Sequence, residues 1–325
     1  MSDDPSLVAH EHALLAAYLD QLKSQRQLAA LTISSYRRDL TELLSLLAAD
    51  KAKVSITDST HFQIRKFAAQ LHARELNARS IARKLSAWRG FFAWLCEQNT
   101  IAHNPVDGIK PPKRSKPLPK ALAADDAVRL VSHTPASGDA DTASILCNRA
   151  MFELLYSSGL RVSELAALDV RYVQEPDYVS AGWIDLAAHE VMVTGKGGKM
   201  RSVPIGHAAV EALNAWLAIR GSLIKNDPRP LFLNGRGARV SARIIQMRLK
   251  AHAQAAGLPV NVHPHMLRHS FASHVLQSSG DLRAVQEMLG HASISATQVY
   301  TSLDFQRLAQ VYDAAHPRAK KKPKP

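Results

Sequence analysis

A proline-rich basic stretch, residues 104–120, divides the chain and constrains its fold more than any other feature. It reads "NPVDGIKPPKRSKPLPK", and prolines favour an extended, semi-rigid path over a helix or a paired strand. Domains typically have roughly 100–200 residues, so the 325-residue chain is expected to form two. We place them at residues 1–108 and 121–316, joined by a linker at residues 109–120.

The part before the linker has the periodicity of amphipathic helices. Apolar residues recur every three or four positions in four segments, residues 10–25, 31–50, 57–76 and 78–98. Such segments with short connections predict a compact four-helix domain. Thr32 or Ser34 could cap the second helix, and the third opens on cap residues. The fourth carries an apolar stripe made of Ile81, Leu85, Trp88, Phe92 and Leu95.

Basic residues flank this stripe, and they are Arg79, Arg83, Lys84 and Arg89. They could form the solvated face of a bundle helix, or a face that grips DNA phosphates or enters the major groove. The chain has 41 lysines and arginines against 28 acidic residues, a net charge of +13. A field of that sign attracts polyanions, most commonly nucleic acid, which favours the second interpretation. Two domains joined by a basic linker could then clamp a duplex.

The part after the linker changes its period twice. Residues 123–133 and 144–159 have a helical pattern, and three short stretches at residues 182–186, 190–195 and 200–206 predict a small antiparallel sheet. Helical patterns return at residues 207–221, 241–257, 266–280, 281–291 and 302–316. The expected fold class is therefore mostly α, with a second domain of mixed α/β structure. The basic tail, residues 317–325, is expected to be disordered and to add non-specific affinity for phosphates.

Several functional classes are not supported by the sequence. Cys96 and Cys147 match no CxxC spacing, so we expect buried reduced thiols and no disulfide framework. His263, His265 and His269 have spacings that a metal ion could accept. However, no HExxH motif, cysteine cluster or nearby acidic ligand accompanies them, so neither a metal site nor a cofactor is predicted.

A membrane role is also not favoured. The N-terminus is acidic and polar where a signal peptide would be basic and then apolar. No apolar run approaches the length that spans a bilayer. We therefore expect a cytoplasmic protein without membrane insertion, although an anionic membrane surface, or no partner at all, could also account for the positive charge.

Two candidate cations lie at turns. Arg161 follows a glycine at a predicted helix start, where Ser163 or Glu164 could cap backbone amides. A helix start and a guanidinium both favour an anion. Lys196 lies in "TGKGGK", the turn between the last two predicted strands, where it could swing into a cleft; Lys199 is a second candidate. This turn lacks the P-loop pattern and no helix follows it, so nucleotide binding is not predicted.

The remaining candidates are close to the C-terminus. His265 and Arg268 are three residues apart, on one side of a predicted helical turn. His291 follows a Leu-Gly pair, and Tyr300 comes nine residues later in a stretch rich in small polar residues. Each of these residues alone has an ordinary structural explanation, as a salt-bridge partner, a solvated side chain or a core residue.

Together, such residues suit displacement at a phosphodiester. In-line attack builds negative charge on the non-bridging oxygens, which metal ions or fixed donors stabilise. Two arginines offer permanently charged forks that match phosphate oxygens. A hairpin lysine could protonate the departing 5′ oxygen. A tyrosine, with an unperturbed pKa near 10, could act as nucleophile if neighbouring cations or a histidine help it to ionise.

At this point the sequence resembles the tyrosine recombinase (integrase) family. The motifs occur in order as "GLR", "TGKGGK", "HMLRH", "LGH" and "VYT". The resemblance implies that the N-terminal helices form a SAM-like core-binding domain and that the second domain is catalytic. It implies a nucleophile, Tyr300, a general acid, Lys196, and residues that hold and activate the phosphate: Arg161, His265, Arg268 and His291. In one departure, residues 171–186 form a longer connection than the family's usual one, which leaves the start of the first strand open.

The resemblance also implies an assembly. Family members of this type cut and rejoin double-stranded DNA through a 3′-phosphotyrosyl link, without ATP or metal. They act at a chromosomal (dif-like) site in a heterotetramer with a related recombinase, and a DNA translocase activates them. A helix after Tyr300 is expected to dock on a neighbouring subunit. The alternatives are a type IB topoisomerase, a phage or mobile-element integrase, a paralogue that acts as the partner, and a non-enzymatic architectural protein.

Overall fold

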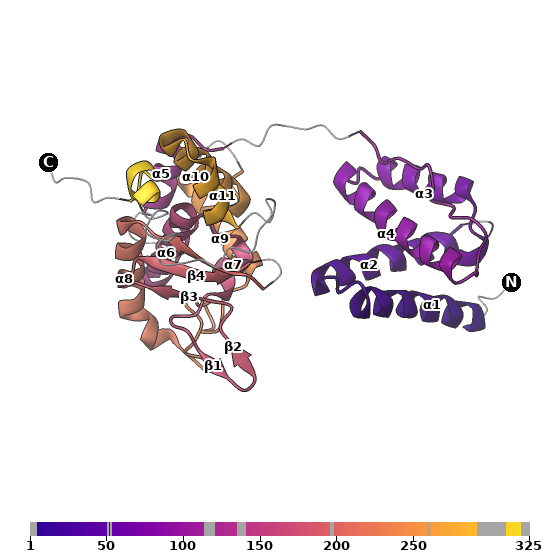
Figure 1. Ribbon diagram of the computed structural model, residues 1–325, viewed down its shortest axis with the longest axis horizontal. Coiled ribbons are helices and arrows are strands. Elements are labelled where there is room, and N and C mark those ends of the chain that lie inside the picture. The colour runs from indigo at the N-terminus through magenta and orange to yellow at the C-terminus, as the bar shows by residue number, and fades with distance from the viewer. Residues whose placement is uncertain are drawn as a thin grey trace. The chain divides into compact units, whose positions relative to one another are not determined.

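The computed structural model describes residues 5–50, 52, 54–113, 121–134, 141–195, 198–258, 261–290 and 310–319. The chain separates into two compact units, Met1–Lys116 and Pro117–Pro325 (Figure 1). This division falls within the stretch that the sequence analysis assigned to a linker. Each unit has a hydrophobic core of its own.

The first unit contains the four helices that the sequence predicts. They are α1 (Pro5–Ser24), α2 (Ala30–Ala48), α3 (His61–Ala73) and α4 (Ala78–Glu97), with a short 3-10 helix, η1 (Ile56–Asp58), before α3. Thr60 and Gln63 form the expected cap of α3, a reciprocal capping box. The predicted cap of α2 is wrong: this helix begins at Ala30, where no side chain caps it, so Thr32 and Ser34 lie inside its first turns.

The apolar stripe of α4 forms the centre of the first core. All five of its predicted residues are at most 1% exposed, and α4 packs against α1, α2 and α3. The indole of Trp88 donates a hydrogen bond to the carbonyl of Asp39 on α2 at 2.9 Å. Ile109 also packs into this core, so the first unit extends beyond the expected boundary at residue 108.

The second unit is a mixed α/β structure, as predicted. Its helices are α5 (Ala124–Ser132), α6 (Thr142–Ser158), α7 (Val162–Ala167), α8 (His207–Arg220), α9 (Ala242–Ala255), α10 (Pro264–Ser279) and α11 (Leu282–Leu289), with a 3-10 turn, η2 (Gly221–Leu223). Helix α6 contributes ten buried residues and packs against α5, α8, α9 and α10. It is therefore the central element of this core.

The predicted sheet is confirmed as an antiparallel meander of β3 (Gly182–Asp185), β4 (Glu190–Thr194) and β5 (Met200–Pro204). In its register Val193 pairs with Arg201, and both side chains are buried. The long connection before β3 holds a small hairpin, β1 (Gln174–Glu175) and β2 (Tyr178–Val179). This hairpin accounts for the length that the sequence left unexplained.

Residues 310–319 pack on the second unit of their own chain, and residues 310–315 are helical. The Tyr312 hydroxyl is 2.6 Å from that of Ser157, and Arg318 forms an ion pair with buried Glu153. His316 and Ala319 are also buried, and the backbone N–H of His207 donates to the carbonyl of Ala319 at 3.1 Å. The prediction of a disordered tail from residue 317 is therefore wrong for residues 317–319, which these contacts hold on the second unit. The docking of this segment on a neighbouring subunit stays a prediction, because a single chain is described.

Two smaller expectations concern the thiols and the membrane. Cys147 is buried, and burial raises the pKa of its thiol to about 11; Cys96 is only partly buried, and both are free. Among the described residues, no helix combines the length and the apolar character that crossing a bilayer requires.

Candidate active site and nucleic-acid interface

Arg161 sits between two helices of the second unit. Helix α6 ends at Gly159, and α7 begins just after Arg161, which is its N-cap residue. A carboxylate oxygen of Glu164 accepts the backbone N–H of Arg161 at 2.8 Å, and the other accepts from its Nη1 at 2.8 Å. The predicted cap by Glu164 is thus present. The Arg161 side chain remains 38% exposed, so an anion can reach it.

Arg268 comes to the same place from α10. Its side chain is buried, and it donates to the carbonyls of Gly159 at 2.6 Å and Leu289 at 2.7 Å. Burial, and then the charge of Arg161, lowers the pKa of Arg268 to about 10, so it stays protonated at neutral pH. The structure therefore brings together the two arginines that the sequence separates by more than a hundred residues.

A third arginine, Arg201, is buried next to Glu164, and sequence reasoning did not single it out. Arg201 on β5 is 3% exposed and makes a bidentate pair with Glu164, at 3.0 and 2.9 Å. Burial alone would raise the pKa of Glu164, but its bonds with Arg201, followed by those with Arg161, hold it below the ordinary value. Three arginines around one carboxylate leave a surplus of positive charge, which suits a phosphate.

His265 lies at the start of α10, three residues before Arg268. It is exposed, and its ring is parallel to that of His263 at a centroid distance of 6.4 Å. His263 caps α10, since its Nδ1 accepts the backbone N–H of Met266 at 3.2 Å. Within the described ranges, no group of three or more His, Cys, Asp or Glu residues could hold a metal ion.

The other three predicted site residues, Lys196, His291 and Tyr300, lie outside the described residues. Their flanks are described for two of them: Gly195 follows β4, and Gly290 ends α11. The backbone N–H of Gly195 donates to the carbonyl of Lys199 at 2.8 Å, which closes the predicted turn. The structure thus brings together Arg161 and Arg268, with His265 on the same helix as Arg268.

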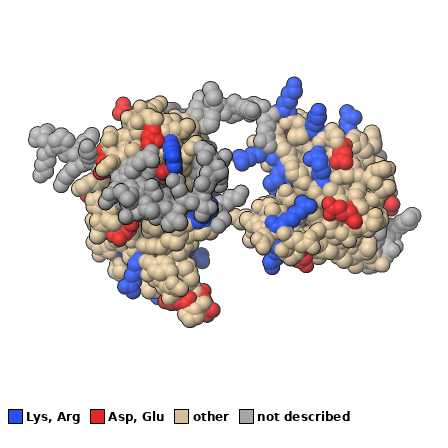
Figure 2. Space-filling model, viewed as in Figure 1, with Lys and Arg blue, Asp and Glu red and all other residues tan. Residues whose placement is uncertain are grey.

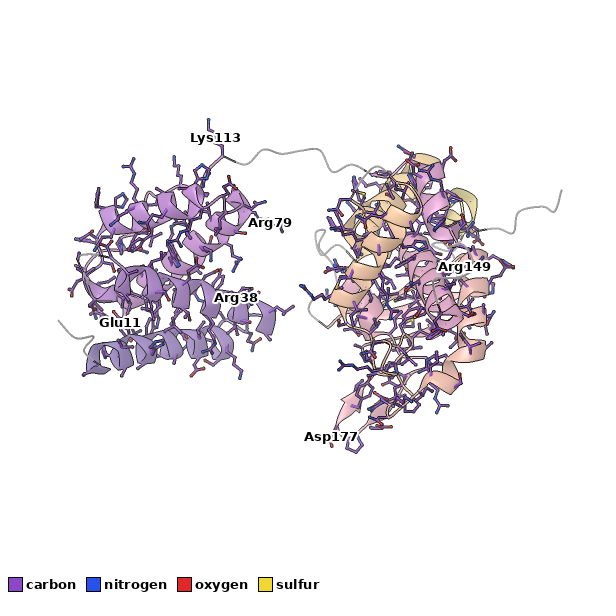
Figure 3. All side chains as sticks on the ribbon, turned by 180° about the vertical axis from the view of Figure 1, so that it is seen from behind. Glu11, Arg38, Arg79, Lys113, Arg149 and Asp177 are labelled. Atoms are coloured by element: carbon purple, nitrogen blue, oxygen red, sulfur yellow. The ribbon has the colours of Figure 1, made fainter. Side chains whose placement is uncertain are left out.

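In the first unit, two of the four predicted DNA-binding residues, Arg79 and Arg83, share one face of α4. A shallow depression on this helix is lined by Arg79, Ser80, Ala82, Arg83 and Ser86. Arg38 on α2 and Arg79 project from the same side of the unit (Figure 3), and lysine and arginine side chains gather on part of its surface (Figure 2). This is the part of the unit best suited to phosphates.

The four basic residues of α4 differ in their freedom to contact a ligand. Arg79 is exposed, and Arg83 is 38% exposed although it forms an ion pair with Asp39. Lys84 is buried, 3.2 Å from Asp39 and paired also with Glu42. Arg89 donates to the carbonyl of Ile109 at 2.9 Å. Lys84 is therefore closed to a ligand. Arg79 and Arg83 can reach one from the depression, and Arg89, although 40% exposed, lies outside that depression and is bonded to the Ile109 carbonyl.

Comparison with known proteins covers nearly the whole chain. Residues 120–307 match the phage integrase family, and residues 15–99 match the phage integrase N-terminal SAM-like domain. The chain is 55% identical over 317 residues to tyrosine recombinase XerC of Ralstonia pickettii (strain 12J), covering 96% of this chain and 95% of that protein.

A second relative and a solved structure agree with this match. Tyrosine recombinase XerC of Pseudomonas aeruginosa (strain LESB58) is 45% identical over 309 residues, with 95% of this chain and 96% of that protein covered. The structure of XerH site-specific recombinase bound to palindromic difH substrate is 22% identical, covers 96% of this chain and 89% of its own, and has a TM-score of 0.64, which shows a shared fold. The chain therefore belongs to the phage integrase family of tyrosine recombinases, as its motifs predicted, and it is an enzyme that breaks and rejoins DNA.

Proposed function

We propose that this chain acts as a XerC-like recombinase in which Tyr300 is the nucleophile. The observation that carries the proposal is the closeness of Arg161 and Arg268: Arg268 bonds the carbonyl of Gly159, two residues before Arg161, and the half-exposed Arg161 is held by Glu164. Two guanidinium groups fixed in this way supply planar donors to the non-bridging oxygens of a phosphodiester.

The proposed cleavage step balances without a cofactor. The Tyr300 oxygen attacks phosphorus, the bond from phosphorus to the 5′ oxygen breaks, and Lys196 gives that oxygen a proton. His265 or His291 accepts the phenolic proton at one ring nitrogen, and both donate to the phosphate through the other. The product is a 3′-phosphotyrosyl link with a free 5′-hydroxyl. A second strand's 5′-hydroxyl reverses the step, so neither ATP nor a metal ion is required.

The first unit is proposed to bind the DNA duplex. Arg79 and Arg83 would contact phosphates from α4, while Lys84 and Arg89 would hold the shape of that face. The basic linker, residues 109–120, and the part of the tail after Ala319 would add non-specific attraction that weakens with salt, because Arg318 is already paired with Glu153. In this proposal the first domain binds the core site, and the second, residues 121–316, carries the chemistry and a C-terminal segment for contact with a neighbouring subunit.

The relatives' names support the proposed substrate, whereas the proposed partners come from the resemblance. Two relatives are XerC proteins, and XerH was solved on a difH substrate. We propose that this chain acts in the cytoplasm at a dif-like site, in a heterotetramer with a XerD-like recombinase, and that an FtsK-like translocase activates it. The outcome would be resolution of chromosome and plasmid dimers.

The direct test is to incubate the purified full chain with a dif-like duplex, with and without a XerD homologue, and to look for covalent protein–DNA complexes. We expect complexes on the dif-like duplex, with exchange of strands only when the homologue is present. The matched control is a duplex of the same composition with a scrambled site. Equal amounts of complex on both duplexes would contradict site-specific recombination.

A further inference from the structure

Arg201 is a buried arginine next to the candidate active site, and its guanidinium group is hydrogen-bonded at every nitrogen. Its side chain leaves β5 on the buried side, and each of its nitrogens has a partner: Nε donates to the Met288 carbonyl at 3.0 Å, and Nη1 and Nη2 bind the Glu164 carboxylate. Glu164 in turn binds both the backbone and the side chain of Arg161. Arg201 is therefore linked through Glu164 to Arg161, which is proposed to hold the phosphate.

The same side chain packs against two glycines. A Cβ atom at Gly195 would lie 3.3 Å from Nη1 of Arg201, and one at Gly290 would lie 3.0 Å from its Cδ and 3.1 Å from its Nε. Gly290 also has a φ of +63°, which only glycine adopts freely. Both positions thus lack a side chain where the guanidinium passes closest to the backbone.

These two glycines directly precede two predicted catalytic residues. Gly195 comes before Lys196 and Gly290 before His291. Arg201 therefore touches the described flank of each, and holds Arg161 through Glu164. The end of β4, the start of α7 and the end of α11 meet around one buried guanidinium group, whose planar fork fixes direction as well as charge.

We infer that Arg201 is a positioning residue for DNA cleavage: it holds Arg161 through Glu164, and it holds Gly195 at the end of β4 and Gly290 at the end of α11, from which the chain continues to Lys196 and His291. The inference rests on the proposed function and deepens it. Small displacements of reacting groups slow a reaction strongly, since about 1 Å of misplacement can cost about 100-fold in rate. Arg201 contacts none of the reacting atoms, so its effect is carried entirely by its neighbours.

The test uses Arg201→Lys in the full chain. A lysine keeps the positive charge beside Glu164 but loses the fork and the Nε bond to the Met288 carbonyl. The assay is the single-turnover rate of covalent complex formation on a nicked suicide duplex under excess enzyme, with site affinity measured in parallel. We expect affinity to match the wild type and cleavage to slow about 100-fold.

A second substrate distinguishes displacement of the turn that carries Lys196 from a general loss of structure. A duplex with a bridging 5′-phosphorothiolate at the scissile bond releases a thiolate, which leaves without a proton. If Arg201 holds the turn that carries Lys196, this substrate recovers part of the lost rate. It does not restore all of it, because Arg161 is also displaced. An equal loss on both substrates would contradict the inference, since the turn would then be unaffected.

The matched control is Arg220→Lys. Arg220 is buried in the same unit and donates to the backbone carbonyls of Pro228, Pro230 and Leu231, and none of its hydrogen bonds among the described residues is to Glu164. We expect this variant to cleave both substrates as the wild type does. An Arg201→Lys variant that behaves like Arg220→Lys would overturn the inference. A wild-type protein that forms no adduct would instead overturn the proposed function, and with it the inference.

Discussion

Asp39→Asn probes the charged cluster that supports the DNA-binding face of α4. The carboxylate of Asp39 is fully buried in α2 and pairs with both Arg83 and Lys84. Asparagine has nearly the same shape but no charge. The substitution therefore leaves the packing around Trp88 intact and removes the counter-charge from two cations.

The size of the effect follows from the geometry. At the 3.2 Å between Lys84 and Asp39, attraction at an effective dielectric constant of roughly 20 is about 5 kcal/mol. Removing one partner of a buried pair typically costs about 3–5 kcal/mol. Here Lys84 keeps Glu42, and Arg83 is 38% exposed and can turn to water. We therefore expect a loss of about 2–3 kcal/mol in the stability of the first unit.

Hydrogen exchange followed by mass spectrometry measures this loss in the intact chain, because it reports each unit separately. A loss of about 2.5 kcal/mol corresponds to roughly 70-fold faster exchange of the slowest amides in α2 and α4. The control is Asp107→Asn, where the side chain is 71% exposed and 4.0 Å from Arg89, and we expect a change within about 0.5 kcal/mol. Equal exchange in the two variants would refute the assigned role of the cluster.

Three further predictions concern pH, salt and metal ions. Burial lowers the pKa of His252, His274 and His316, the last to about 3. As the pH falls below about 6.5, these histidines are protonated in the unfolded chain before they are protonated in the folded one. The free energy of unfolding of the second unit therefore falls by up to about 1.4 kcal/mol per pH unit from His316 alone. Denaturant unfolding between pH 7.5 and 5 checks this, and a flat profile would contradict it. Arg79→Ala should weaken binding similarly on all DNA sequences and reduce the salt slope by about 1, whereas an unchanged slope in a filter-binding titration would argue against a phosphate contact. A chelator should leave the cleavage rate unchanged, and a loss that added magnesium reverses would contradict the metal-free step proposed for Lys196.

Local patterns predicted most of the fold. The division near the linker, the four N-terminal helices and the three strands of the sheet follow from proline content and apolar period, which act over a few residues. The cap of α2 was mispredicted because Thr32 and Ser34 are good capping residues, but the chain is already helical at Ala30. The β1–β2 hairpin was missed because its strands have two residues each, too short to show a period.

The candidate residues that lie in recognisable motifs could be named from the sequence. Their contacts with one another could not, because those contacts depend on how distant helices pack. Arg161 and Arg268 were identified from their motifs, but their meeting at Gly159 depends on how α6 and α10 pack. One sequence feature could have pointed to Arg201: it is an arginine at an inward-facing position of a strand, two residues before Val203 and paired with Val193. Lys84 was expected to flank the apolar stripe and bind DNA, but it is buried; its spacing of three residues from Ile81 is the pattern that could have shown this.

The central claim is that Tyr300 becomes covalently joined to DNA. The measurement is adduct formation on a nicked suicide duplex, followed by mass spectrometry of the proteolysed adduct to identify the residue that carries the nucleotide. Tyr172→Phe is the control, because this tyrosine is exposed and only its hydrogen bond to Gln174 is lost. We expect a nucleotide on Tyr300 in wild type and in the control, and no adduct from a Tyr300→Phe variant that still binds DNA. An adduct that persists in Tyr300→Phe, or a nucleotide on another residue, would contradict it.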